Sequence, residues 1–134
     1  MGTYLIHQAL TQSLIDLNLG LQIAHENVDF TPPDDQAWLD VTRLPNERTS
    51  LTKYEVDQET GIYQISYYQP SGASVGEMLQ NIDLILQKYQ HNTHLVSGDQ
   101  VVVVVNSGQN EGRNENGWYR IDISVSYKTD IIRV

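Results

Sequence analysis

The clearest pattern of apolar and polar positions lies near the end of the chain. Five apolar residues alternate there with polar ones over nine positions: Tyr119, Ile121, Ile123, Val125 and Tyr127. Successive side chains of a strand point to opposite faces, so this alternation predicts a β-strand with one face on a core and the other toward water. The β-branched and aromatic types at these positions favour the same structure.

Two other segments carry apolar residues at the three- and four-residue spacing of amphipathic helices. The first covers residues 4–19 and ends at Gly20, which can adopt the left-handed conformation that often closes a helix. The second covers residues 74–89. It begins with Ser74, followed three residues later by Glu77, which is the pattern of a capping box. We therefore expect two helices, over residues 4–19 and 74–89.

Shorter apolar runs predict strands at residues 21–24, 38–44, 61–69, 93–96 and 101–105. The last of these runs is five consecutive valines. It shows no alternation, which predicts a strand buried on both faces or at the centre of a sheet. Helices at two places, and strands joined mostly by short turns, predict an α+β fold. We expect the two helices to pack on one face of a mainly antiparallel sheet.

Two polar segments do not fit this core. Residues 45–60 have low apolar content and predict an extended polar arm, whereas residues 106–117 have no apolar side chain and predict a long flexible loop. Segments of this kind gain order by packing on another subunit. The residues that we select as candidate interface residues are Arg48, Leu51, Tyr54, Val56, Gln109, Arg113, Asn116 and Trp118.

Composition narrows the possible functions. The 134 residues correspond to a single domain, residues 1–134, that is large enough to bury a core. The sequence has no cysteine, which excludes disulfides and thiolate sites. No segment reaches the length needed to span a bilayer, so we expect no membrane partner. The net charge is −9 with scattered basic residues, and this argues against nucleic-acid binding, which needs a basic patch.

His91 and His94 are candidate metal ligands because they lie three residues apart. No third ligand lies close to them in the sequence, so solvated loop histidines are the favoured interpretation. The acidic residues Asp29, Asp34 and Asp35 lack the alternating ligands, glycine and terminal Glu of a calcium loop. We expect no metal and no cofactor.

The tripeptide His25-Glu26-Asn27 could suggest acid–base chemistry, but the sequence identifies no nucleophile and no second carboxylate to work with it. The favoured interpretation is that Glu26 and Asn27 fix a turn through hydrogen bonds to the backbone. No catalytic residue is predicted, and we do not expect an enzyme.

Taken together, several segments resemble the phage and prophage tail terminator-like (tail-completion) proteins, a family that includes the minor tail protein U of lambda. The likeness covers nearly the whole chain. It departs from the family pattern at His25, where the pattern has Trp, and at Asp40, where it has Arg. The segments that carry the resemblance are the first helix with Ile6, Ala9 and Leu10, the stretch Ile23–Pro32, the strand Trp38–Pro45, Gly61–Ile65, and Trp118 with Tyr119.

This resemblance implies a structural protein of the virion tail, assembled in the host cytoplasm. Its lambda-type relatives form a hexameric ring on the tail tube, which ends tube polymerisation and provides the head-joining surface. The implied partners are copies of the chain itself, the tail tube protein and the head–tail connector protein, with DNA passing through the ring without specific binding. Two alternatives stay open. One is a small ligand-binding or regulatory α+β module with a pocket near His25 and Tyr63, and the other is a metal-dependent hydrolase that uses His91 and His94.

Overall fold

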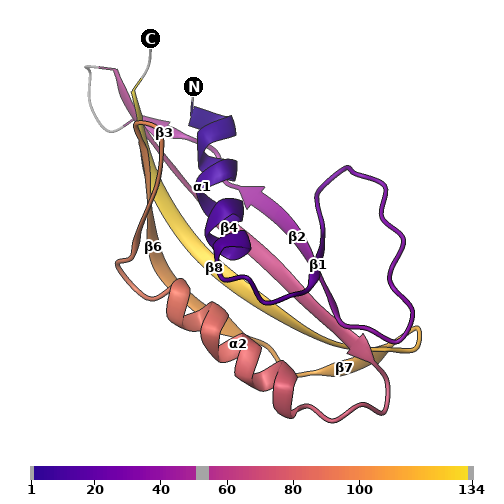
Figure 1. Ribbon diagram of the computed structural model, residues 1–134. Coiled ribbons are helices and arrows are strands. Elements are labelled where there is room, and N and C mark those ends of the chain that lie inside the picture. The colour runs from indigo at the N-terminus through magenta and orange to yellow at the C-terminus, as the bar shows by residue number, and fades with distance from the viewer. Residues whose placement is uncertain (1, 51–54, 133–134) are drawn as a thin grey trace.

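A computed structural model describes residues 2–50 and 55–132 of the chain. Figure 1 shows a long curved sheet with helices packed against it. The elements follow one another as α1 (Gly2–Asp16), β1 (Gln22–Ala24), β2 (Trp38–Pro45), β3 (Thr49–Ser50), β4 (Val56–Pro70), α2 (Gly76–Lys88), β5 (His94–Ser97), β6 (Gln100–Gln109), β7 (Arg113–Glu115) and β8 (Trp118–Ile132).

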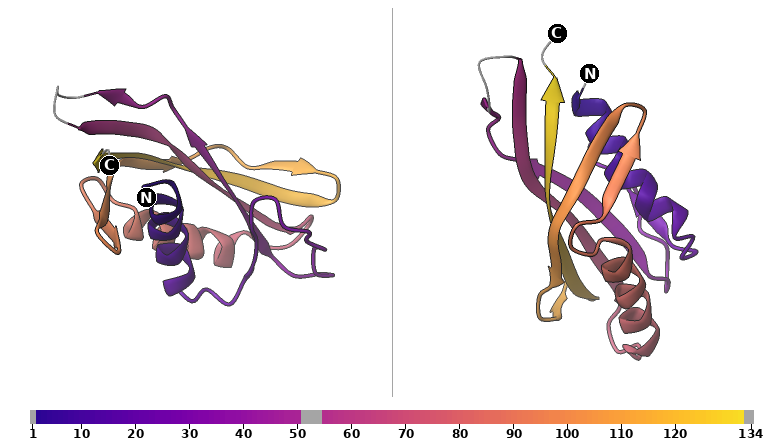
Figure 2. Two further views of the ribbon diagram at one scale, coloured as in Figure 1. Left: turned by 90° about the horizontal axis from the view of Figure 1, so that it is seen from above. Right: turned by 90° about the vertical axis from the view of Figure 1, so that its left-hand side faces the viewer.

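The sheet has the strand order β1-β2-β4-β8-β6-β5, with β3 paired to β4 and β7 paired to β8. Every pairing is antiparallel except that of β1 with β2. Both helices lie on the same side of the sheet, as the two views in Figure 2 show. The predicted α+β fold, with two helices on one face of a mainly antiparallel sheet, is confirmed.

The centre of the sheet is a ribbon made of β4 and β8. Each strand has 15 residues, and they pair without interruption from Val56 opposite Ile132 to Pro70 opposite Trp118. At a rise of about 3.4 Å per residue, this ribbon is roughly 48 Å long. The alternating pattern of residues 119–127 therefore belongs to a longer strand. Ile121, Ile123 and Val125 are buried beneath the helices, as the alternation predicts.

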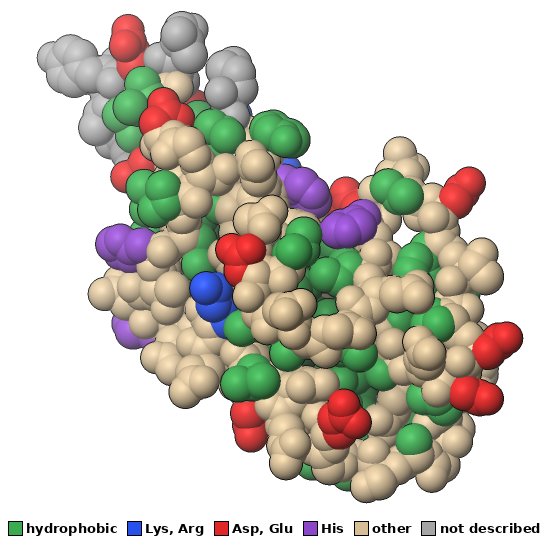
Figure 3. Space-filling model, in the orientation of Figure 1, with side chains coloured by type: hydrophobic (Ala, Val, Ile, Leu, Met, Phe, Trp, Pro, Cys, Tyr) green, Lys and Arg blue, Asp and Glu red, His purple; other side chains and the backbone are tan. Residues whose placement is uncertain are grey.

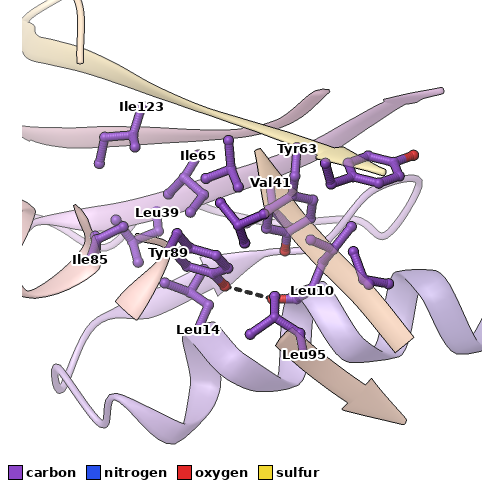
Figure 4. Close-up of a cluster of buried hydrophobic side chains, with 14 of the residues drawn as sticks. Leu10, Leu14, Leu39, Val41, Tyr63, Ile65, Ile85, Tyr89, Leu95 and Ile123 are labelled. Carbon is purple, nitrogen blue, oxygen red and sulfur yellow. Dashed lines mark hydrogen bonds between the residues drawn. The ribbon is translucent and has the colours of Figure 1, made fainter. Parts of the chain in front are cut away.

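The core lies between this ribbon and the helices (Figure 4). The helices contribute Ile6, Ala9, Leu10 and Leu14 from α1, and Met78, Ile82 and Ile85 from α2. Two buried tyrosines satisfy their hydroxyl groups within it, as buried tyrosines usually do. Tyr89 donates to the carbonyl oxygen of Leu10 at 2.6 Å, and the hydroxyl of Tyr63 lies 2.8 Å from that of Thr11. Burial raises the pKa of both tyrosines, so both rings stay neutral.

The helix ends differ from the sequence prediction. Helix α1 ends at Asp16, three residues before its predicted end. The N–H groups of Leu17 and Asn18 bond to carbonyl oxygens three residues back, which is a tighter turn than that of an α-helix, and Asn18 takes a φ of 52°. Helix α2 begins at Gly76, with Val75 as N-cap and no side-chain capping bond. The predicted capping box is therefore wrong. Ser74 lies one position before the N-cap, and its hydroxyl accepts only a long 3.5 Å bond from the N–H of Gly76.

The valine run also differs. Strand β6 lies between β8 and β5, inside the sheet as predicted. The predicted burial of this strand on both faces is wrong, however, because the helices cover only one face of the sheet. Val102 and Val104 are fully buried, whereas Val101 is 40% exposed.

Both polar segments take part in the sheet. Residues 106–117 are mostly strand, since β6 continues to Gln109 and β7 follows, so the predicted long flexible loop is wrong. Residues 45–60 include the end of β2, the short β3 and the start of β4. Backbone hydrogen bonds to neighbouring strands order these segments without burial of apolar side chains. Leu51 and Tyr54 lie outside the described residues.

Gly61 in the central ribbon allows neighbouring atoms to lie close to its backbone, so a larger residue at this position should destabilise the protein. A Cβ on Gly61 would lie 2.7 Å from the Tyr127 hydroxyl oxygen and 2.8 Å from the Leu44 carbonyl oxygen. We expect Gly61→Ala to lower the free energy of unfolding by about 1–3 kcal/mol because the site is already filled. Urea unfolding measures this change. The matched control is Gly108→Ala on β6, where a Cβ would meet nothing within 4 Å, and a similar loss there would contradict the steric explanation.

Candidate functional site

The candidate interface residues fall into two groups at opposite ends of the central ribbon. Val56 pairs with Ile132 at one end, and Trp118 pairs with Pro70 at the other. We call the first the arm end, which comprises Arg48, β3, Val56 and Ile132. We call the second the hairpin end, which comprises Gln109, the β7–β8 hairpin and Trp118. Figure 1 shows β3 and β7 at the two extremes of the molecule.

A buried carboxylate organises the arm end. Glu59 is 3% exposed and accepts hydrogen bonds from Arg43 at 2.9 Å, Arg48 at 3.3 Å and the Tyr127 hydroxyl at 2.7 Å. A buried charge needs such partners, because an unpaired carboxylate would be strongly destabilising there. Arg48 also donates to the Thr3 hydroxyl at 2.8 Å. The segment between β2 and β4 is thereby tied to the first turn of α1.

A second carboxylate organises the hairpin end. Asp122 accepts hydrogen bonds from Arg120 and Ser66 at 2.7 Å each, from Arg113 at 3.1 Å and from the Asn110 side chain at 3.3 Å. Asn110 also pairs with the backbone of Asp122, through its own N–H and through its side-chain oxygen. The turn between β6 and β7 is therefore held onto β8 by both side-chain and backbone contacts.

Aromatic rings gather beside Asp122 on the face of the sheet that the helices leave uncovered. Trp38 stacks on Tyr68 with ring centroids 4.2 Å apart, and Trp118 and Phe30 pack against Trp38 at 5.8 and 5.2 Å. The Arg120 guanidinium lies 5.2 Å from the centre of the Tyr68 ring, which is a cation–π distance. Trp118, selected from the sequence as an interface residue, is thus also part of this small second core.

Sequence reasoning missed the Asp122 network and the aromatic cluster. Asp122 and Arg120 stand on the polar side of the predicted strand, where they look like solvated residues. Only the register of β2, β4 and β8 brings Trp38, Tyr68 and Arg120 side by side, and apolar periodicity does not define register. The alternation of Trp38 with Leu39 was the available signal, because it places a large ring on the second face.

The remaining candidate residues do not form a chemical site. His91 and His94 are exposed, and His91 Nδ1 bonds to the carbonyl oxygen of Val105. Among residues 2–50 and 55–132, no group of three or more His, Cys, Asp or Glu could hold a metal ion. His25 lines a shallow cleft along α1, whereas Tyr63 is fully buried and does not line that cleft. The structure therefore does not bring His25 and Tyr63 together in one pocket.

The interpretation of Glu26 and Asn27 as residues that fix a turn is confirmed only in part: Asn27 lies in a turn, but Glu26 bonds to the backbone of a distant strand instead of to neighbouring backbone. The Glu26 side-chain oxygen accepts a 3.1 Å hydrogen bond from the N–H of Arg43, on the outer edge of β2. Asn27 takes a φ of 60°, which suits a turn residue.

No helix in the described part of the chain is long and apolar enough to cross a membrane.

The sequence profile of the family described as "Phage tail terminator protein" matches residues 5–127. The chain belongs to this family. Membership implies a structural role in tail assembly within the virion tail, with other tail and head components as partners, and points away from an enzyme.

A solved structure has the same fold as this chain. It is 21% identical in sequence and superposes with a TM-score of 0.79, covering 100% of this chain and 99% of the other. At this level of identity the likeness concerns the fold alone. No curated protein matches the chain.

The Asp122 network makes the free energy of unfolding of this protein depend on pH in the acidic range. Burial on its own would raise the pKa of Asp122, but hydrogen bonds from Arg120, Ser66 and Arg113 outweigh it and lower that pKa below its ordinary value. A carboxyl group whose pKa is lowered by folding contributes stability above its unfolded pKa. That contribution is lost as the pH falls through the folded value.

We therefore expect the free energy of unfolding to fall as the pH drops below about 4, the usual range of an Asp carboxyl. Asp122→Asn should lower stability near neutral pH by about 1–3 kcal/mol, because hydrogen bonds to a charged group are lost, and should flatten the acid slope. Urea unfolding at a series of pH values measures both effects. The control is Asp83→Asn on the exposed side of α2, and an unchanged acid slope in Asp122→Asn would contradict the assignment.

Proposed function

We propose that the protein forms a closed ring, hexameric as in its lambda-type relatives, that caps the tail tube. The ring ends tube polymerisation and provides the surface to which the head–tail connector binds. The observation that carries this proposal is the presence of two chemically different ends on one rigid ribbon. Subunits of a cyclic ring pack head to tail, so each subunit needs two different surfaces that complement one another.

The two ends differ in the way that a head-to-tail contact requires. The arm end presents Ile132, which is 73% exposed, next to a strand pair held by Glu59. The hairpin end presents Arg113 and Glu115, with half-exposed side chains, next to Trp118. Because the ribbon is roughly 48 Å long, neighbours bound at the two ends would not obstruct each other. The surfaces along its length stay available for the tube and the connector.

A mixing experiment tests whether the contact joins two different ends. We expect Ile132→Arg at the arm end and Gln109→Arg at the hairpin end each to abolish ring formation, because a charge is placed in a desolvated contact. An equimolar mixture of the two variants retains one intact pair of ends and should give dimers but no rings. Light scattering across a range of concentrations measures the mass of each species.

Gln87→Arg on the exposed side of α2 serves as the control and should form rings as the wild type does. A contact between two identical ends predicts a different result, since the mixture would then contain no dimer of one variant with the other. A wild-type chain that stays monomeric alone and with tail tube protein would instead favour a ligand-binding module.

The acidity of the subunit suits a channel through which DNA passes. Figure 3 shows many Asp and Glu side chains on this face of the molecule and few Lys or Arg, in keeping with the net charge of −9. Like charge opposes binding of the phosphate backbone, so DNA slides through without being retained.

Charge reversal tests this part of the proposal. Asp29, Asp34 and Asp35 are exposed in the segment between β1 and β2. Replacing all three with Lys should increase the retention of duplex DNA on assembled rings, and added salt should abolish the increase. Filter binding measures retention. The matched variant with Asn at the three positions removes charge without adding any and should retain less DNA than the Lys variant; equal retention by wild type and both variants would count against a role for charge.

A further inference from the structure

The turn that closes the β7–β8 hairpin has a chemical property that the proposed ring does not use. Asn116 and Gly117 connect Glu115 to its pairing partner Trp118. Both turn residues have positive φ, 52° and 84°. A two-residue hairpin turn of this type needs positive φ at both central positions, and Asn-Gly is its preferred sequence. In this dipeptide the side-chain amide of Asn116 lies next to the backbone nitrogen of Gly117. Gly117 has no side chain that could block approach to that nitrogen.

The two groups that would react are open to solvent, although the Gly117 carbonyl oxygen accepts a 3.1 Å hydrogen bond from the N–H of Ser71. Asn116 and Gly117 are both exposed. Within the described residues, neither the side-chain amide of Asn116 nor the N–H of Gly117 has a hydrogen-bond partner. Nothing lies within 4 Å of the point where a Cβ on Gly117 would sit. We propose that Asn116 is a site of spontaneous deamidation, driven by attack of the Gly117 backbone nitrogen on the side-chain amide.

The reaction needs only water and a base. The Gly117 nitrogen gives up its proton and forms a bond to Cγ of Asn116, and the bond from Cγ to the amide nitrogen breaks, which releases ammonia. The product is a cyclic imide. Water then opens the imide at one of its two carbonyl carbons. Opening at Cγ gives aspartate, and opening at the backbone carbonyl gives isoaspartate, in which the main chain runs through the former side chain.

Isoaspartate would disturb the hairpin end in two ways. It adds the Cβ atom of residue 116 to the main chain, so the turn becomes too long for the pairing of Glu115 with Trp118. It also places a carboxylate beside Glu115, which already pairs with Arg113 and Arg120. These arginines are the ones that hold Asp122. Conversion of one amide therefore weakens both the strand register and the ion network at this end.

The chain contains its own control. Residues 106–117 include four asparagines, and Asn116 is the only asparagine of the sequence that precedes a glycine. Asn114 is also exposed but precedes Glu115, whose side chain crowds the backbone nitrogen. Asn114 also lies in β7, and its side-chain oxygen accepts a 3.0 Å hydrogen bond from the Ser71 hydroxyl. Trypsin cleaves after Arg113 and after Arg120, so a single peptide carries both asparagines. Mass spectrometry of that peptide compares them in the same sample.

The experiment ages the folded full-length protein in mildly alkaline buffer and follows this peptide over time. We expect deamidation to be roughly tenfold faster at Asn116 than at Asn114, which corresponds to a barrier lower by about 1.4 kcal/mol. An isoaspartyl methyltransferase should label the aged protein at residue 116. Equal survival of the two amides, or loss at Asn114 first, would overturn the proposal. The test needs only the folded subunit, so its outcome is independent of ring formation.

A variant separates the effect of charge from that of the longer main chain. Asn116→Asp adds the carboxylate but keeps the normal backbone, and Asp tolerates positive φ nearly as well as Asn. We expect protein rich in isoaspartate to unfold at a lower urea concentration than Asn116→Asp. If the aged protein and the variant unfold at the same concentration, lengthening of the turn has no effect and that part of the inference fails.

Discussion

The uninterrupted pairing of β4 with β8 is the constraint on which the rest of the structure depends. It places each residue of one long strand opposite a defined residue of the other, from Val56 and Ile132 to Pro70 and Trp118. A shift by one residue would move the buried side chains of either strand to the opposite face. The helices cover the face that carries Ile121, Ile123 and Val125, and the same register brings Tyr68 and Arg120 together on the other face.

Two carboxylates stabilise the ribbon at its ends, on opposite faces. Glu59 lies on the helix-covered face and joins the arm end to α1 through Arg48 and Thr3. Asp122 lies on the uncovered face and joins β7 to β8 through Arg113. Ion pairs with this degree of burial add little net stability but define geometry strongly, because removal of one partner leaves a buried charge unpaired. This is a suitable way to hold polar segments that have few or no apolar side chains to bury.

The elements that the sequence predicted well are those with strong apolar periodicity. The stripe of α2 and the alternation along β8 each point to one structure, and two helices on one face of an antiparallel sheet follow from them. The prediction of a flexible loop at residues 106–117 and that of burial on both faces for Val101–Val105 failed for a shared reason. Their structure is determined by backbone pairing and by which face the helices cover, and neither is visible in local side-chain patterns. The candidate interface residues come from two segments of the sequence, and only the register places those segments at opposite ends of the ribbon.

The position of β8 in the chain also has a consequence for folding. Strand β4 pairs with residues 118–132, α1 packs against β5 and β6, and β2 reaches the ribbon only through β4. Most contacts therefore join segments far apart in the sequence, a topology that folds slowly because long loops must close first. During synthesis, the earlier elements have no complete sheet to join until the ribosome has released Ile132. The ribbon of a nascent chain therefore stays incomplete until its last strand has been made, because β8 pairs with β4 along its whole length.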